Sequence, residues 1–160
     1  MDYNYRIYVE FPKERNTKGQ LKLTDFSGTL KWGPVDALGR GSNCEENGKN
    51  HSNWMNKYAD IPTGEYETSI ADAEPGTTFG PNKRVSLHPA LNGNAKLAEE
   101  AGRDQIMIHG GELAKDPSTP WYPLKPTYGC IRLFDTDQEQ LIKEIEKLGG
   151  GKGIITITDV

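Results

Sequence analysis

The sequence predicts a mainly β fold, either a sandwich or a mixed sheet, with one amphipathic helix near its carboxyl end. Two observations favour this fold class. The chain has 18 glycines and 10 prolines in 160 residues, a composition typical of the many turns in β-rich proteins. Several short segments alternate apolar and polar side chains, whereas only one long segment has clear helical periodicity. The length suits one domain, which we expect to span residues 1–160.

The amino-terminal segments predict an antiparallel sheet. Residues Tyr3 to Phe11 alternate and are rich in aromatic and β-branched side chains, which predicts a strand that ends at Pro12. The alternation from Gln20 to Trp32 is interrupted at Ser27-Gly28. This interruption predicts two strands that pair through a turn.

The segment from Gly39 to Asn53 is polar, rich in small residues and aperiodic. These properties predict a long exposed loop or a mobile lid, because no side chain in the segment is expected to anchor it in a core. The segment contains Cys44 and His51.

The middle of the chain predicts two strands and a short helix. Turn residues precede a strand over Glu65 to Ile70, and Arg84 to His88 predicts a short strand that stops before Pro89. Asn94 is placed to cap a short helix over Ala95 to Ala101.

The carboxyl end contains the clearest helix, which we expect over Thr136 to Leu148. Thr136 and Glu139 form a capping-box pattern, and the apolar residues that follow lie on one helical face. A run of glycines then turns the chain into a last strand over Ile154 to Thr158.

A histidine and a cysteine lie at the two ends of the most informative stretch. His109 ends a strand predicted over Gln105 to His109, and Cys130 begins another apolar run. Residues 112–126 between them contain four prolines, which predicts a structured surface loop that brings the two runs side by side. A neighbouring imidazole lowers the pKa of a thiol and takes its proton. We therefore expect Cys130 to be a nucleophile and His109 its base.

Gly129 fits the same interpretation. A residue without a side chain permits a tight bend, and it lets a substrate carbonyl approach backbone N–H groups that would form an oxyanion hole. Plainer interpretations stay open. Cys130 would also fit as a small buried side chain or as the partner of Cys44 in a disulfide, and His109 as a histidine at a strand end.

The residues around these side chains resemble the L,D-transpeptidase catalytic domain, also called the YkuD type. Its signature is a histidine that ends an apolar strand, a gap of variable length, then Ser or Thr, any residue, Gly, Cys, an apolar residue and Arg or Asn. Here the signature corresponds to His109 and the run Thr127-Tyr128-Gly129-Cys130-Ile131-Arg132. Tyr128 stands where many members have His, and Gly110 stands where some have Ser.

The resemblance implies a domain of that type and acyl transfer on the stem peptides of peptidoglycan. Cys130 would form a thioester with the peptide, His109 would manage the proton, and Gly129 would shape the loop of the nucleophile. The residues expected to contact the substrate are Arg132, Thr127, Tyr128 and Gly110, with the Arg132 guanidinium on a substrate carboxylate.

The acceptor decides between related activities. An amine would make the protein a transferase, and water would make it an L,D-carboxypeptidase or an exported enzyme that degrades the cell wall. A cell-wall-binding module without turnover is a second alternative, for instance with Cys130 tied to Cys44, and a metal-dependent peptidase is a third.

No cofactor or metal is expected. The cysteines and histidines lack the spacing of a zinc site, and no glycine motif for dinucleotides or phosphates is present. The net charge of −4 and the scattered basic residues disfavour nucleic acid or an anionic membrane as a partner.

Neither a membrane span nor a signal peptide is expected, because the chain has no long apolar run and its first residues alternate polar with aromatic side chains. A protein of this sequence that acts on the cell wall, outside the cytoplasm, would therefore have had its leader removed or would be exported by a route that uses none.

Overall fold

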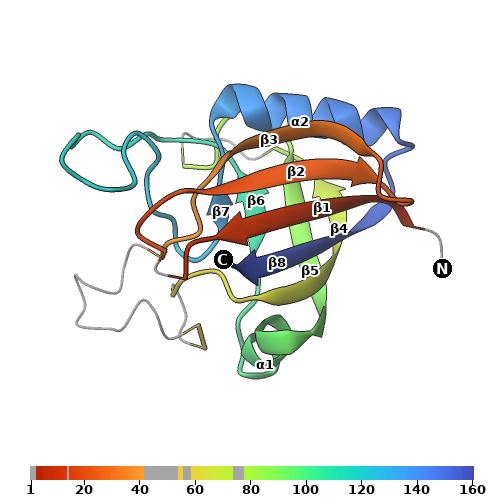
Figure 1. Ribbon diagram of the computed structural model, residues 1–160, viewed down its shortest axis with the longest axis horizontal. Coiled ribbons are helices and arrows are strands. Elements are labelled where there is room, and N and C mark those ends of the chain that lie inside the picture. Colours follow the sequence, from red (N-terminus) through yellow and green to blue (C-terminus); the bar gives the residue numbers. More distant parts are fainter. Residues whose placement is uncertain (1–2, 14, 42–53, 56–58, 74–77) are drawn as a thin grey trace.

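A computed structural model of the chain describes residues 3–13, 15–41, 54–55, 59–73 and 78–160 (Figure 1). These residues form eight strands and two helices, so the prediction of a mainly β fold is confirmed. The strands are β1 (Tyr3–Phe11), β2 (Gly19–Asp25), β3 (Leu30–Ala37), β4 (Gly64–Ala71), β5 (Arg84–Asn92), β6 (Met107–His109), β7 (Ile131–Arg132) and β8 (Lys152–Asp159). The helices are α1 (Gly93–Glu100) and α2 (Asp135–Lys147).

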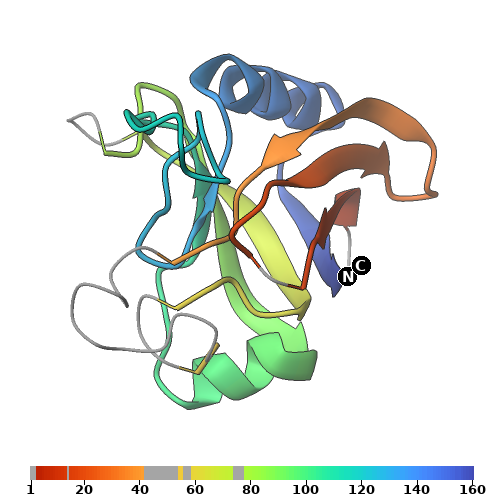
Figure 2. The same ribbon diagram turned by 60° about the vertical axis from the view of Figure 1, so that its left-hand side comes forward.

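The strands form one mixed sheet in the order β3-β2-β1-β8-β4-β5-β6-β7. The pairs β1/β8 and β6/β7 are parallel, and the other neighbours are antiparallel. The two ends of the sheet meet, because Leu38, just after β3, and Arg132 in β7 donate backbone hydrogen bonds to each other at 3.0 and 2.9 Å. The sheet is therefore curled almost into a barrel (Figures 1 and 2).

The core lies inside the curled sheet and under α2. Helix α2 packs against β3, β5 and β6, and α1 packs against β4 and β5 at the other end of the molecule (Figure 2). The predicted apolar face of α2 is buried at Leu141, Ile142 and Ile145. In β8, Ile155 and Ile157 are both buried, as the alternation of that segment requires.

The predicted amino-terminal sheet is confirmed. Strand β1 has the predicted bounds, and β2 and β3 pair antiparallel on either side of a tight turn. In that turn the Asp25 carboxylate accepts hydrogen bonds from the Ser27 hydroxyl and the Thr29 N–H, at 2.6 and 2.9 Å. Gly28 has a φ of +102°, which a side chain would disfavour.

Strand β5 is longer than predicted, since it continues through Pro89 to Asn92. Proline is tolerated in a strand at a bulge, where its missing N–H breaks no ladder bond. The β4/β5 register shifts at this point, because Tyr66 pairs with Ala90 whereas Thr68 pairs with Leu87. The prediction that Pro89 ends the strand was therefore wrong.

Asn94 does not cap α1, which begins one residue earlier at Gly93. The first turn of α1 is bonded instead to a distant segment. The Asn94 side chain donates to the Thr63 hydroxyl at 2.9 Å, and the Ala95 N–H donates to the Thr63 carbonyl at 2.7 Å. A tertiary neighbour thus satisfies donors that a local cap would otherwise bind.

The capping box predicted at Thr136 is also wrong. Helix α2 begins at Asp135, and its N-cap residue Phe134 makes no side-chain cap hydrogen bond. The Asp135 carboxylate is turned to another part of the chain, where it accepts the Gly111 N–H at 2.7 Å. An acidic residue in the first turn still interacts favourably with the helix dipole.

The segment predicted as a loop or lid over Gly39 to Asn53 begins in the core. Residues 39–41 are buried, and the Arg40 Nε donates to the Asn16 amide oxygen at 2.6 Å. The Gly41 N–H donates to the Asp60 carboxylate at 2.9 Å. The start of the segment is therefore anchored, contrary to prediction, and residues 42–53, with Cys44 and His51, lie outside the described residues.

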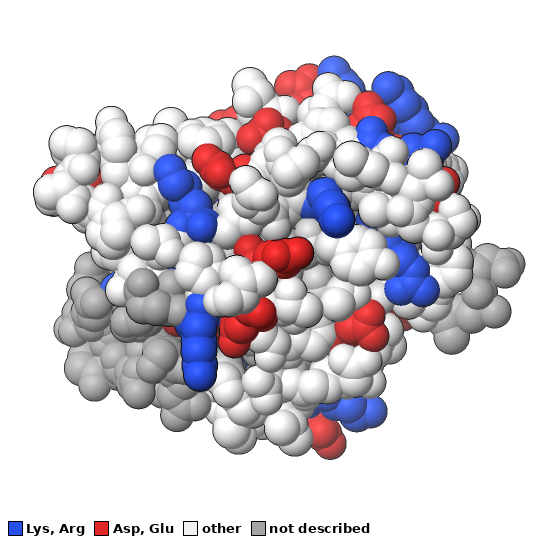
Figure 3. Space-filling view, in the orientation of Figure 1, with Lys and Arg blue, Asp and Glu red and all other residues white. Residues whose placement is uncertain are grey.

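No helix in the described part of the chain is long and apolar enough to cross a membrane. On the face shown in Figure 3, acidic and basic side chains are interspersed.

Candidate functional site

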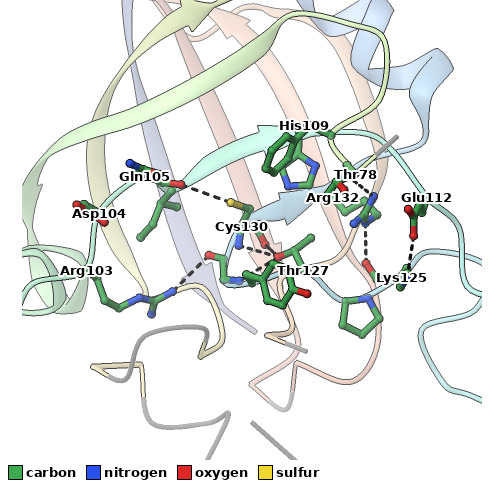
Figure 4. A pocket seen from close by; sticks show the side chains of 15 residues that line it. Thr78, Arg103, Asp104, Gln105, His109, Glu112, Lys125, Thr127, Cys130 and Arg132 are labelled. Carbon is green, nitrogen blue, oxygen red and sulfur yellow. Dashed lines mark hydrogen bonds and ion pairs between the residues drawn. The ribbon is translucent and has the colours of Figure 1, made fainter. Parts of the chain in front are cut away.

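A cavity of about 620 Å³ lies beside the parallel pair β6 and β7, and both Cys130 and His109 line it (Figure 4). His109 is the last residue of β6, and Cys130 immediately precedes β7. In the register of the two strands, Ile108 lies opposite Ile131. The strand, loop and strand expected from the sequence therefore bring the two residues to one cavity.

His109 is buried, with 1% of its surface exposed, and its ring is held in one orientation. Nδ1 lies 2.7 Å from the Gly110 carbonyl oxygen. A carbonyl only accepts hydrogen bonds, so the proton of the neutral ring is on Nδ1, and Nε2 is left as a proton acceptor. The Phe79 ring meets the imidazole edge to face at 4.8 Å.

The imidazole of His109 is neutral at physiological pH. Burial lowers its pKa to about 4, and the nearby charges of Arg132 and Arg84 act in the same direction. The hydrogen bond to Gly110 opposes this shift but does not outweigh it. The site thus contains a base without a resting positive charge.

Cys130 is a free cysteine whose thiol is buried with the cavity on one side. Its Sγ lies 3.6 Å from the Gln105 carbonyl oxygen, to which the thiol donates. Burial raises the pKa of Cys130, against the smaller opposite effects of the Met107 N–H and of Arg103. The expectation of a thiol pKa below its ordinary value is therefore wrong for the free protein, and the resting pair is a neutral thiol with a neutral imidazole.

Gln105 has the left-handed backbone conformation that side chains disfavour, with a φ of +55°. Among the described residues it is the one residue other than glycine with a positive φ. Its carbonyl is the acceptor for the Cys130 thiol, so a strained residue lies next to this thiol.

Thr127 shapes the loop that carries the nucleophile. Its hydroxyl accepts the N–H groups of Cys130 and Gly129, at 2.7 and 3.1 Å, and donates to the Cys130 carbonyl at 2.9 Å. These two N–H groups are therefore already bonded. The oxyanion hole that the sequence led us to expect from them is wrong for this arrangement.

Both the backbone conformation at position 129 and a close neighbour require a glycine there. Its φ is +105°, and a Cβ at this position would lie 2.6 Å from the Arg103 Nη2. The tight bend expected at Gly129 is present. The group that approaches its backbone in this structure is Arg103 of the protein itself.

Arg132 lines the cavity from β7, but much of its guanidinium is engaged by the chain. Nη1 donates to the carbonyls of Gly110 and Thr78, at 2.7 and 3.3 Å, and Nε donates to the Lys125 carbonyl at 2.7 Å (Figure 4). Arg132 thereby joins the segment after His109 to the segment before Cys130. Its expected contact with a substrate carboxylate stays a prediction.

The other two residues expected to bind substrate occupy different positions. Tyr128 lines the cavity and is 59% exposed, and its expected contact with a substrate stays a prediction. Gly110 is not among the residues that line the cavity. It acts on the site through its carbonyl, which accepts hydrogen bonds from both His109 and Arg132.

Sequence reasoning missed the roles of Arg103, Gln105 and the Gly110 carbonyl. Arg103 is 5% exposed and lines the cavity, and its partners are distant in sequence. The contributions of Gln105 and Gly110 come from backbone carbonyls, which residue types do not encode. The sequence does not indicate the φ of +55° at Gln105, since glutamine has no preference for that conformation.

Several other aromatic and titratable residues lie away from the cavity. The Arg40 guanidinium lies over the Trp121 ring, 4.3 Å from its centre. His88 is exposed and lies 3.2 Å from Glu99. Within the described part of the chain, no three or more histidine, cysteine or acidic side chains are grouped as metal ligands.

Comparisons with known proteins give a fold but no family. No family model matches the chain, and no curated protein matches it. Among solved structures it is similar to Bd1075 of Bdellovibrio bacteriovorus, with a TM-score of 0.50 and 14% sequence identity. The match covers 98% of this chain and 48% of the other, so the chain spans about half the length of that protein. At this identity the likeness shows the fold alone.

Proposed function

We propose that this protein is a cysteine-dependent acyltransferase of the L,D-transpeptidase type that acts on the stem peptides of peptidoglycan. One observation carries the chemical part of the proposal: Cys130 and His109 line one cavity, with the His109 Nδ1 proton bound to Gly110 and Nε2 left to accept a proton. The nature of the substrate rests on the sequence resemblance.

In the proposed reaction, His109 Nε2 removes the thiol proton as Sγ attacks the scissile carbonyl carbon. The C–N bond to the terminal D-amino acid then breaks, and the imidazolium returns the proton to the leaving amine. A thioester remains on Cys130. An acceptor amine or water attacks the thioester while His109 takes the acceptor's proton, and return of this proton to sulfur restores the thiol.

The neutral resting state of the pair suits this sequence of steps. A buried imidazole with a pKa of about 4 takes up a proton only when a compensating negative charge forms beside it. Proton transfer is thereby linked to the attack itself, and a thiolate is not stored in the free protein. The Gly110 carbonyl accepts the Nδ1 proton throughout, so the ring keeps its orientation.

The charges around the cavity suit a substrate that carries a carboxylate. Arg103 and Arg132 are nearly buried cations that line it. Lys125 also lines the cavity, but it is paired with Glu112 at 2.9 Å and contributes little net charge. Buried guanidinium groups attract an anion more strongly than exposed ones, because little water screens them.

The experiment is to incubate tetrapeptide muropeptides with the protein and to follow thioester, released D-alanine and cross-linked product by mass spectrometry. Cys130→Ser and His109→Ala are expected to abolish turnover, whereas their matched controls Cys44→Ser and His88→Ala are expected to keep it. Undiminished D-alanine release by Cys130→Ser would contradict the proposal. Release without cross-links in the wild-type protein would assign water as the acceptor and make the protein an L,D-carboxypeptidase.

A further inference from the structure

Arg103 is a nearly buried cation that binds two separate parts of the backbone. Its Nη1 donates to the carbonyls of Trp54 and Asp60, at 2.5 and 2.9 Å. Its Nη2 donates to the carbonyls of Ala59 and Gly129, at 3.2 and 3.3 Å. Arg103 therefore joins the segment before β4 to the residue that precedes the nucleophile, as the dashed line from Arg103 shows in Figure 4.

The contact with Gly129 is close and shaped to the guanidinium. A Cβ at Gly129 would lie 2.6 Å from Nη2 and 3.2 Å from the Ala59 carbonyl, so a side chain there would displace this contact. A planar fork with several N–H donors reaches four carbonyls at once, whereas a lysine ammonium is a single point with three donors.

The same loop is fixed from its other side by Thr127, whose hydroxyl accepts the N–H groups of Gly129 and Cys130. Arg103 holds the Gly129 carbonyl, and Thr127 holds the N–H of the same residue. These contacts fix the peptide bond between Gly129 and Cys130, to which the Cα of Cys130 is attached.

We propose that Arg103 is a positioning residue for Cys130, which fixes the loop of the nucleophile through the Gly129 carbonyl and supplies positive charge that stabilises the thiolate as it forms. The inference rests on the proposed function for the role of Cys130, but it concerns the reactivity of the thiol itself and is measured without a peptide substrate.

The charge part of the inference follows from the surroundings of the thiol. Arg103, Arg132 and Arg84 each act to lower the pKa of Cys130, and Arg103 has the largest effect of the three. His109 beside them is neutral, and the charged residues Asp104, Glu112 and Lys125 also line the cavity. Loss of the Arg103 charge should therefore raise the pKa of the thiol.

The first test measures the rate of Cys130 alkylation by iodoacetamide against pH, in a Cys44→Ser background where Cys130 is the only thiol. Arg103→Gln is expected to move the midpoint of the profile upward by about one pH unit, which lowers the rate below the midpoint about tenfold. Arg15→Gln is the matched control. Arg15 is equally buried and bonds to the Pro12 and Ile61 carbonyls, but it does not line the cavity. An unchanged midpoint in a folded Arg103→Gln protein would overturn the charge role.

The second test uses Arg103→Lys, which keeps the charge and loses the fork. Hydrogen exchange of the Gly129 and Cys130 amides is expected to become at least about tenfold faster, while the amides of β1 keep their wild-type rates. Unchanged protection of these two amides would overturn the positioning role. Since neither test needs turnover, a failure of the inference is distinct from a failure of the proposed acyl transfer.

Discussion

His109 makes the stability of this protein depend on pH through its burial. Its pKa is about 4 in the folded protein and about 6.5 in the unfolded chain, so the unfolded state binds more protons between these values. The contribution of His109 to stability is fully present above pH 6.5, and it is lost progressively as the pH falls toward 4.

This dependence can be isolated by comparison with His109→Gln, which cannot titrate. From pH 7 to pH 4.5 we expect the free energy of unfolding of the wild-type protein to fall by about 2 kcal/mol more than that of the variant. Urea unfolding at the two pH values measures both differences, and the carboxylates common to the two proteins cancel. Equal losses would mean that burial does not lower the pKa of His109 in the folded protein.

At the scale of single elements, the sequence predicted the strands better than their ends. Alternation located β1 and the β2/β3 pair, because burial of one sheet face imposes a period of two on the chain. It placed the end of β5 wrongly at Pro89, because a bulge is a property of two strands together. The predicted starts of the two helices were wrong for a related reason. The first turns of α1 and α2 are hydrogen-bonded to Thr63 and Gly111, and no local sequence pattern indicates these distant partners.

The sequence also predicted only part of the candidate site. A residue pattern identified Cys130 and His109, and the structure places both at one cavity. The pattern did not predict that Thr127 takes the two backbone N–H groups expected to form an oxyanion hole. It did not predict Arg103 either, because the Arg103 partners lie 26 to 49 residues away in the chain.

Gln138 shows how α2 supports the site from outside the cavity. This residue is fully buried, and it lies on the same helical face as Leu141, Ile142 and Ile145. Its side-chain Nε2 donates to the carbonyls of Lys83 and Ile108, at 2.8 and 3.2 Å. Ile108 precedes His109 in β6, so the helix is hydrogen-bonded to the strand that carries the base.

We expect Gln138→Met to cost about 1–3 kcal/mol of stability, since a buried carbonyl and a partly buried one lose this donor. The Gln138 Oε1 has no hydrogen-bond partner among the described residues, so loss of the amide oxygen adds nothing to this cost. Gln140→Met on the same helix is the control. The Gln140 side chain bonds to Glu144 at a partly buried position, so its loss should change stability by less than about 0.5 kcal/mol. Urea unfolding of both variants measures the costs, and equal values would show that the contact with β6 is unimportant.

At the scale of the whole molecule, closure of the sheet determines how rigidly the strand beside the cavity is held. Strand β7 has only two residues, and as a free edge it would be weakly held. Its Arg132 is instead paired on one side with β6 and on the other with Leu38, which follows β3. The seam between the two ends of the sheet therefore runs beside the cavity that contains Cys130.

If this seam is part of the cooperative core, the Leu38 and Arg132 amides should exchange hydrogen only when the whole protein unfolds. The two residues are almost completely buried, and each donates to the other's carbonyl. Native-state hydrogen exchange should then give both amides the same free energy of opening as amides in the central strand β1. The Tyr122 amide, which donates to Thr119 in the loop between β6 and β7, is the control and should open locally at a much lower free energy. If the Leu38 and Arg132 amides opened at a free energy as low as that of the Tyr122 amide, the two ends of the sheet would separate without global unfolding.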